Sequence, residues 1–189
     1  MKRTLYLKIL IAYFIFGVFG FVIVATFMQQ MTTKQLQKSK AEELYNAATI
    51  LADTEATDLY KNEVSLTTVK TDIDVLSRII KARIQLLNPS GLIVLDSASD
   101  INIDDPASVN GFDITKLSGS FYSIGRFYDQ FASDHLSVAA PVTTNYTVRG
   151  YVIIHYDISL LNSSTNTLVN IDYIMLLILF LFLRVPPDI

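Results

Sequence analysis

The residues best suited to bind a small molecule lie in an aromatic-rich stretch from Phe121 to Phe131, FYSIGRFYDQF. The guanidinium group of Arg126 can pair with a carboxylate through two parallel hydrogen bonds, and neighbouring rings can supply an apolar wall. We therefore predict Arg126, Tyr128 and Tyr122 as ligand-binding residues. The alternative is structural, because aromatic residues favour strands and an exposed Arg126 can form a surface ion pair.

Two further groups of side chains could bind a metal ion. Four carboxylates follow one another on a single loop: Asp96, Asp100, Asp104 and Asp105. Such oxygen ligands suit Ca²⁺ or Mg²⁺, but their spacing differs from that of a calcium loop, so we expect a solvated acidic loop. The two histidines, His135 and His155, lack partners at metal-ligand spacing. We predict no metal site and no cofactor.

Catalysis by an activated nucleophile is not indicated. The chain has no cysteine, which excludes a thiolate nucleophile and a disulfide framework. Serine and aspartate are plentiful, but no nucleophile-elbow motif is present. We predict no catalytic residue in this chain.

A membrane anchor is predicted near the N-terminus. Residues 9–28 (ILIAYFIFGVFGFVIVATFM) are twenty residues without a charge, and as a helix they span about 30 Å, one hydrocarbon core. Lys2, Arg3 and Lys8 precede them, so the positive-inside rule places residues 1–8 in the cytoplasm and 29–170 outside. A cleaved signal peptide is the alternative, but its apolar core is shorter, roughly 7 to 15 residues.

A second apolar segment is shorter. Residues 173–183 (YIMLLILFLFL) are eleven apolar residues, about half a crossing. We expect a partial transmembrane helix over 171–184, a tail over 185–189, and a chain that stops partway through its second crossing of the plasma membrane.

The charge of the outer region limits its partners. Residues 29–170 contain eleven Lys and Arg against sixteen Asp and Glu, a net charge of −5. Nucleic-acid binding needs a clustered basic face, so we predict no nucleic-acid partner.

Two helices are predicted in the first half of the outer region. Residues 29–61 lack Gly and Pro and are rich in Ala, Leu, Glu, Gln and Lys, which favours a long helix that continues the first membrane segment. Residues 65–81 have apolar side chains at steps of 3, 4, 3 and 4, typical of an amphipathic helix.

About five strands are predicted next. Residues 83–87 and 92–96 flank the turn Asn88-Pro89-Ser90-Gly91 and predict an antiparallel hairpin. A loop follows, with one helical turn near 113–117. Residues 121–131 predict a strand kinked at Gly125, and 135–142 and 149–156 a final strand pair around 143–148. Asp157 or Ser159 should cap a helix leading to the second membrane segment.

Three segments in this order carry a family resemblance: NPSGLIVLDS (88–97), SVAAPV (137–142) and RGYVII (149–154), between two membrane segments. The chain resembles the extracytoplasmic PAS-like sensor domain called Cache or PDC, in the input region of bacterial two-component sensor histidine kinases. The resemblance implies an α+β fold with a long N-terminal helix and an antiparallel sheet. Arg126, Phe127 and Tyr128 are similar to the Arg-x-aromatic-aromatic pattern with which some Cache domains hold amino acids.

The resemblance also implies a function. Such a region senses an extracellular cue, a small molecule or an envelope ligand, and signals across the bilayer as a homodimer to a HAMP linker and kinase domain. No phosphoacceptor or nucleotide-binding motif is present, so no catalytic domain is expected here. The alternatives are the sensor region of a chemotaxis receptor or cyclic-dinucleotide synthase, or a stand-alone anchored binding protein.

Overall fold

The computed structural model describes residues 2–100, 106–116, 121–161 and 174. Residues 37–160 form one compact unit, and the residues up to Leu36 belong to another. The elements, in chain order, are the helices α1 (Lys2–Leu51), η1 (Ala52–Ala56), α2 (Thr57–Tyr60) and α3 (Leu66–Ile80), the strands β1 (Arg83–Leu87) and β2 (Ile93–Asp96), the 3₁₀ turn η2 (Ile114–Lys116), and the strands β3 (Tyr122–Gly125), β4 (His135–Thr144) and β5 (Thr147–Asp157).

The first part of α1 presents apolar side chains outward. Tyr13, Phe16 and Phe27 have exposed fractions of 80%, 77% and 66%, as suits a helix surrounded by lipid rather than by protein. Within the described part of the chain, this is the one helix long and apolar enough to cross a membrane. The predicted span over 9–28 lies inside it.

The predicted long helix over 29–61 is confirmed, with one change of geometry near its end. Five residues, Ala52–Ala56, form a π-helical turn between α1 and α2. The hydroxyl of Thr57 donates to the carbonyl of Ala52, five residues earlier, at 2.8 Å, and so pairs a carbonyl in this wider turn. Single π turns inside helices are uncommon and widen the helix by one residue.

The second predicted helix is also confirmed, as α3. Ser65 is its N-cap: the side-chain oxygen accepts from the backbone N–H of Thr68 at 3.2 Å. Val69 and Ile73 are fully buried, as the apolar face of the predicted amphipathic helix requires. The helix ends at Lys81 in the left-handed conformation, with φ of 54°.

The five strands form one antiparallel sheet in the order β2-β1-β5-β4-β3. The predicted hairpin joins β1 and β2, and the carboxamide oxygen of Asn88 accepts from the backbone of Ser90 and of Leu92. Gly91 has φ of +87°, and a β-carbon there would lie 2.6 Å from the β-carbon of Phe112. The turn therefore requires glycine at this position.

Two strand predictions need correction. The strand predicted over 121–131 ends at Gly125, because Phe127, Tyr128 and Asp129 have positive φ angles of 42°, 53° and 58° that no strand allows. The turn predicted over 143–148 is shorter: Asn145 and Tyr146, with φ of 50° and 60°, make the tight turn that joins two longer strands, β4 and β5.

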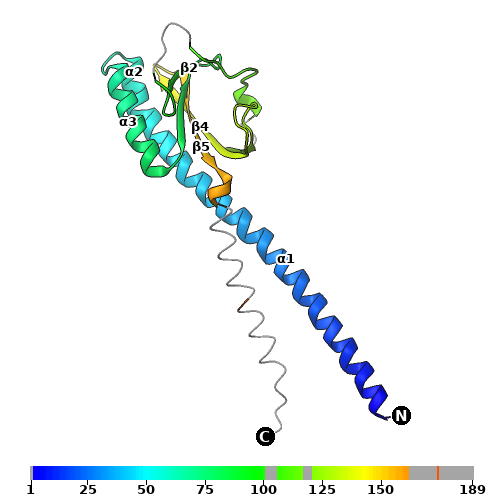
Figure 1. Ribbon diagram of the computed structural model, residues 1–189. Helices are drawn as coiled ribbons and strands as arrows, with labels where there is room; N and C mark the ends of the chain where they lie inside the picture. Colours follow the sequence, from blue (N-terminus) through cyan, green and yellow to red (C-terminus); the bar gives the residue numbers. More distant parts are fainter. Residues whose placement is uncertain (1, 101–105, 117–120, 162–173, 175–189) are drawn as a thin grey trace. The chain divides into compact units, whose positions relative to one another are not determined.

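The sheet of the Gln37–Leu160 unit has a helix-covered face and a loop-covered face. Figure 1 shows α3 and the last turns of α1 along one face. Val109 and Phe127, from the described segments 106–116 and 126–134, pack with Leu87 and Ile153 on the other. Leu44 of α1 and Ile73 of α3 pack with Ile84, Leu86 and other inward residues of the sheet into the larger core cluster. Because side chains alternate along a strand, their neighbours project to the opposite face, where the site lies.

The chain after β5 is described over a short stretch. Residues 158–161 are helical, and the carboxylate of Asp157 accepts from the backbone N–H of Ser159 at 2.8 Å, as an N-cap does. The predicted second membrane segment over 171–184 lies outside the described residues, apart from Ile174, and the tail over 185–189 lies outside them entirely.

Candidate functional site

A row of polar side chains crosses four strands on the loop-covered face of the sheet. The strand register brings Gln85 opposite Asp96, Arg83 opposite His155, and His155 opposite Ser137. Gln85, Ser137 and His155 are no more than 1% exposed, and Asp96 is 6% exposed. Burying a polar group is unfavourable unless the group is hydrogen-bonded. The hydrogen bonds among these side chains must therefore offset the cost of burying the row.

The hydrogen bonds of the row run in one direction. Asp96 is ionised and can only accept, so the Gln85 amide nitrogen must donate to it, at 2.9 Å. The Gln85 amide oxygen then accepts from Nε2 of His155 at 3.0 Å. Nδ1 of His155 is left as the acceptor for the hydroxyl of Ser137, at 2.8 Å. The neutral Nε2–H tautomer of His155 therefore satisfies every member of the row.

Burial keeps His155 neutral. Its ring lies 4.5 Å from the ring of Phe127 and 4.8 Å from that of Phe131, centroid to centroid. Burial in these surroundings, reinforced by the nearby positive charge of Arg83, lowers the pKa of His155 from 6.5 to about 3. This histidine therefore has a structural hydrogen-bonding role at neutral pH.

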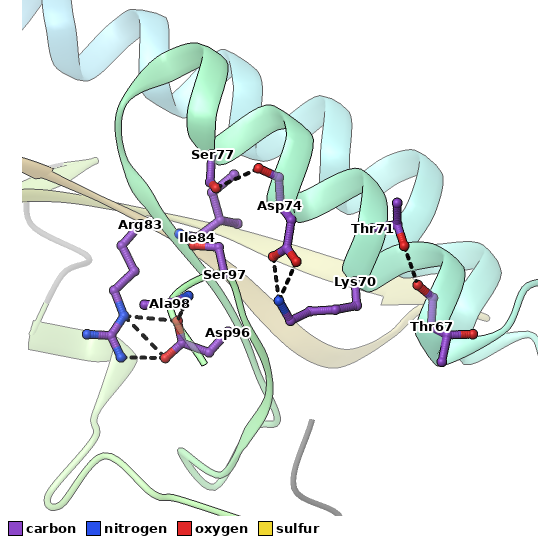
Figure 2. A network of polar contacts seen from close by, with 10 residues as sticks. All are labelled: Thr67, Lys70, Thr71, Asp74, Ser77, Arg83, Ile84, Asp96, Ser97 and Ala98. Carbon is purple, nitrogen blue, oxygen red and sulfur yellow. Dashed lines mark hydrogen bonds and ion pairs between the residues drawn. The ribbon is translucent and has the colours of Figure 1, made fainter. Parts of the chain in front are cut away.

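Asp96 anchors the other end of the row. Nε of Arg83 donates to its two oxygens at 2.9 and 3.2 Å, and Nη2 adds a third bond (Figure 2). The backbone N–H of Ala98 donates at 2.9 Å. Burial alone would raise the pKa of Asp96, but the bonds from Arg83, Gln85 and Ala98 outweigh it and hold the pKa below its ordinary value. The carboxylate is ionised and already fully hydrogen-bonded.

A cavity of about 540 Å³ opens beside this ion pair, within the range of small-molecule sites. Its walls come from β1, β2, the loop that follows β2, and the turn before β4. The lining residues are Arg83, Ile93, Val94, Leu95, Asp96, Ser99, Asp100, Pro106, Ala107, Ser108 and Gln130. Gln130 lines the cavity, and its side-chain oxygen is buried and has no hydrogen-bond partner among the described residues. A buried amide oxygen without a partner is unfavourable.

The turn that presents Gln130 has an unusual backbone. Three consecutive non-glycine residues, Phe127, Tyr128 and Asp129, are left-handed, each at a cost of order 1–3 kcal/mol. Phe127 is 6% exposed and covers His155, while the Tyr128 hydroxyl donates to the carbonyl of Asp113 at 2.7 Å. Packing and hydrogen bonding thus hold a strained turn against the site, a combination common at ligand-binding sites.

The structure separates the three residues predicted to bind a ligand. Tyr122 packs against the helix-side cluster, and Tyr128 against the opposite cluster that contains Phe127. Arg126 is exposed, and none of the three lines the 540 Å³ cavity. Their ligand-binding role stays a prediction, and the cavity presents a different arginine, Arg83.

The residues that line the site could have been found by one signal. Arg83 and Gln85 alternate with Ile84 and Leu86 in β1, and His155 interrupts the apolar run of β5. Polar residues at alternate positions of a buried strand indicate a polar feature on one face of the sheet. Their partners could not be read this way, because register and strand order are not visible in single strands.

The other candidate ligands for metals are placed as follows. Asp96 pairs with Arg83, and Asp104 and Asp105 lie outside the described residues. His135 stacks on Phe131 at 4.0 Å between ring centroids. Within the described residues, no group of three potential metal-ligating side chains comes together.

Solved structures share this fold, although no family model and no curated protein matches the sequence. A sensory box/GGDEF family protein domain from Vibrio parahaemolyticus matches with a TM-score of 0.55 at 18% identity, over 74% of this chain and 61% of that one. The extracellular domain of the putative histidine kinase vpHK1S-Z8 matches with a TM-score of 0.52 at 18% identity, over 74% of this chain and 58% of that one. The sensor domain of the Vibrio cholerae histidine kinase DctB matches with a TM-score of 0.51 at 12% identity, over 70% of this chain and 54% of that one.

These similarities confirm the predicted α+β fold. The chain spans between 54% and 61% of the length of these three structures. At such low identity the similarity concerns the fold, and function must be argued from the site.

Proposed function

We propose that this chain is the membrane-anchored signal-input region of a two-component sensor histidine kinase, with its ligand site in the cavity beside Arg83. The cavity is the observation that carries the proposal, because it lies on the loop-covered face of a sensor-type sheet, beside the ion pair of Arg83 and Asp96. The fold, shared with histidine-kinase sensor domains, supports the signalling role.

The proposed topology follows from the N-terminal helix. Its exposed apolar stretch anchors the chain in the plasma membrane, with residues 1–8 in the cytoplasm and the sensor domain outside. Two copies would associate as a homodimer, and a ligand that binds one arrangement of the dimer more tightly would shift the population toward it.

A second output is supported by one comparison. The Vibrio parahaemolyticus structure belongs to a GGDEF family protein, so the same kind of input domain occurs with an output other than a kinase.

Fusing residues 1–189 to the HAMP and kinase region of a characterised sensor kinase tests the primary proposal. Ligand-dependent phosphorylation of the fusion is expected, and phosphorylation that no binding compound changes would contradict it.

The ligand site is tested with the full chain in phospholipid nanodiscs. Thermal-shift screening against amino acids, carboxylates, short peptides and divalent cations should yield a compound that raises the melting temperature. Arg83→Met and Gln130→Leu should each abolish that ligand-induced shift, and Arg126→Met is the matched control outside the cavity. A shift lost in Arg126→Met and kept in the other two variants would move the site to the aromatic stretch.

A further inference from the structure

A second concave surface lies in the helical layer that covers the sheet. α3 runs beside the last turns of α1 (Figure 1), and a groove of about 300 Å³ lies between the two helices. The residues that line it are Ala47, Ile50, Leu51, Thr54, Glu55, Asp72 and Leu76. All of them belong to the compact unit of residues 37–160 and to stretches that the structure describes.

The floor of this groove is apolar. Leu51 is buried, and Ala47 and Leu76 pack, partly buried, against the larger core cluster. The side chain of Ala47 ends at its β-carbon, so it leaves space between the helices that a longer side chain would fill.

Three large aliphatic side chains extend the apolar floor to the surface. Ile50, Val75 and Ile79 have exposed fractions of 66%, 52% and 72%. Ile50 lines the groove, as do Asp72 and Leu76. Val75 and Ile79 each follow one of the latter two by three positions, which places them on the same side of α3. Single exposed aliphatic residues are ordinary, but a group of them beside an apolar groove indicates an interaction surface.

The charges of the groove indicate which partner fits it. Both charged residues that line it, Glu55 and Asp72, are acidic, and neither forms an ion pair within the described part of the chain. Arg78, the exposed arginine of α3, lies about 160° around the helix from Leu76 and so on another side. A second copy of this chain would bring the same acidic rim to the groove, whereas a basic segment would neutralise it.

We propose that the groove between α1 and α3 is a docking site for another protein, which lays a basic amphipathic helix into it. Helices that bind in grooves present apolar anchors at i, i+3, i+4 and i+7. Such anchors can fill the space over Ala47 and cover Ile50 and Ile79, while Lys or Arg beside them pairs with Glu55 and Asp72. The inference goes beyond the proposed ligand site, because no residue lines both the groove and the cavity beside Arg83.

The probe is a designed, fluorescently labelled helical peptide of about four turns, with Leu at i, i+3, i+4 and i+7 and Lys beside them. Fluorescence anisotropy measures its binding to the full chain in phosphatidylcholine nanodiscs, and empty nanodiscs give the background. A matched peptide has Glu in place of every Lys. The basic peptide should bind about tenfold more tightly than the acidic one, and added salt should reduce that difference.

Four variants locate the binding. Ala47→Leu should weaken it about tenfold by filling the groove, although the substitution adds apolar surface that would strengthen non-specific adhesion. Ile79→Ser should weaken it to a similar extent through loss of an exposed apolar contact. Asp72→Asn should weaken it about threefold, whereas Asp53→Asn, the same change at an exposed position outside the groove, should leave it unchanged.

Three results would overturn the inference. The first is equal binding of the two peptides, and the second is binding that Ala47→Leu and Ile79→Ser leave unchanged or strengthen. The third is no binding to the wild type, as expected if a second copy or residues 162–189 occupy the groove. Light scattering distinguishes these two occupants, because Ile79→Ser would convert a dimer held by this face into a monomer. A compound whose thermal shift depends on Arg83 would still support the proposed ligand site.

Discussion

Acidification should destabilise this protein through one buried histidine. His155 is 1% exposed and is held neutral between Gln85 and Ser137. Its pKa is about 3 in the folded protein and 6.5 ordinarily. Between these two values the unfolded chain binds a proton that the folded chain does not. Because the folded pKa is the lower one, stability falls as the pH decreases below about 6.5, and the loss is complete near pH 3.

The size of the effect follows from the two pKa values. Stability should change by up to about 1.4 kcal/mol per pH unit within this window, so about 2 kcal/mol is lost between pH 7.5 and pH 5. Domains of this size have total stabilities of about 5–15 kcal/mol, so the loss is readily measured. Ordinary carboxylates titrate mainly below pH 5 and contribute little to this interval.

The chain offers a matched control because it has two histidines. Urea unfolding of the wild type, His155→Gln and His135→Gln, in nonionic detergent at constant ionic strength, is followed by circular dichroism from pH 7.5 to 5. The wild type and His135→Gln should lose about 2 kcal/mol across this range, whereas His155→Gln should be nearly flat. A slope that survives in His155→Gln, or disappears in His135→Gln, would refute the buried neutral state assigned to His155.

Three further substitutions test the packing of the Gln37–Leu160 unit in thermal melts. Gly150→Ala should cost about 3 kcal/mol, because the new methyl group meets the carbonyl of Leu87 in the neighbouring strand and the Tyr60 hydroxyl at 2.7 Å; an unchanged melting temperature would show that the strands can separate. Tyr60→Phe should stabilise by about 1 kcal/mol, since the buried Tyr60 hydroxyl has no hydrogen-bond partner among the described residues; a loss of stability would reveal a hidden partner. Ser65→Ala should cost about 1 kcal/mol through loss of the α3 cap, and Ser65→Asp should retain it; equal melting of the two variants would argue against the cap.

Local patterns were sufficient for most of the secondary structure. The 3-4-3-4 spacing of apolar residues predicted α3, and Asn88 to Gly91 predicted the hairpin between β1 and β2, because helix periodicity and turn chemistry are properties of neighbouring residues. The strand prediction for 121–131 failed for a reason that neighbouring residues do not show. Phe127 to Asp129 adopt left-handed angles that their side chains do not favour, and burial of Phe127 stabilises that conformation.

The predicted ligand-binding residues differ from those that line the cavity. Arg126, Tyr128 and Tyr122 are chemically distinctive and close in sequence, and their ligand-binding role stays a prediction. The structure places Tyr122 and Tyr128 in clusters on opposite faces of the sheet. Arg83 and Asp96 form the ion pair beside the cavity although they are thirteen positions apart in the sequence. Gln130, forty-three positions after the last residue of β1, completes the wall.

Composition and periodicity alone thus specify an apolar anchor helix, an amphipathic helix and a set of strands, because lipid solubility and side-chain alternation act within single segments. Strand order and register are set by packing across the sheet. That packing joins Asp96, Gln85, His155 and Ser137 into one buried row, with Arg83 paired to Asp96 at its end and the cavity beside that ion pair. Gln85 and His155, seventy positions apart in the chain, become hydrogen-bonded partners. Their polar groups pair with each other because the packed sheet excludes the water that would otherwise hydrogen-bond to them.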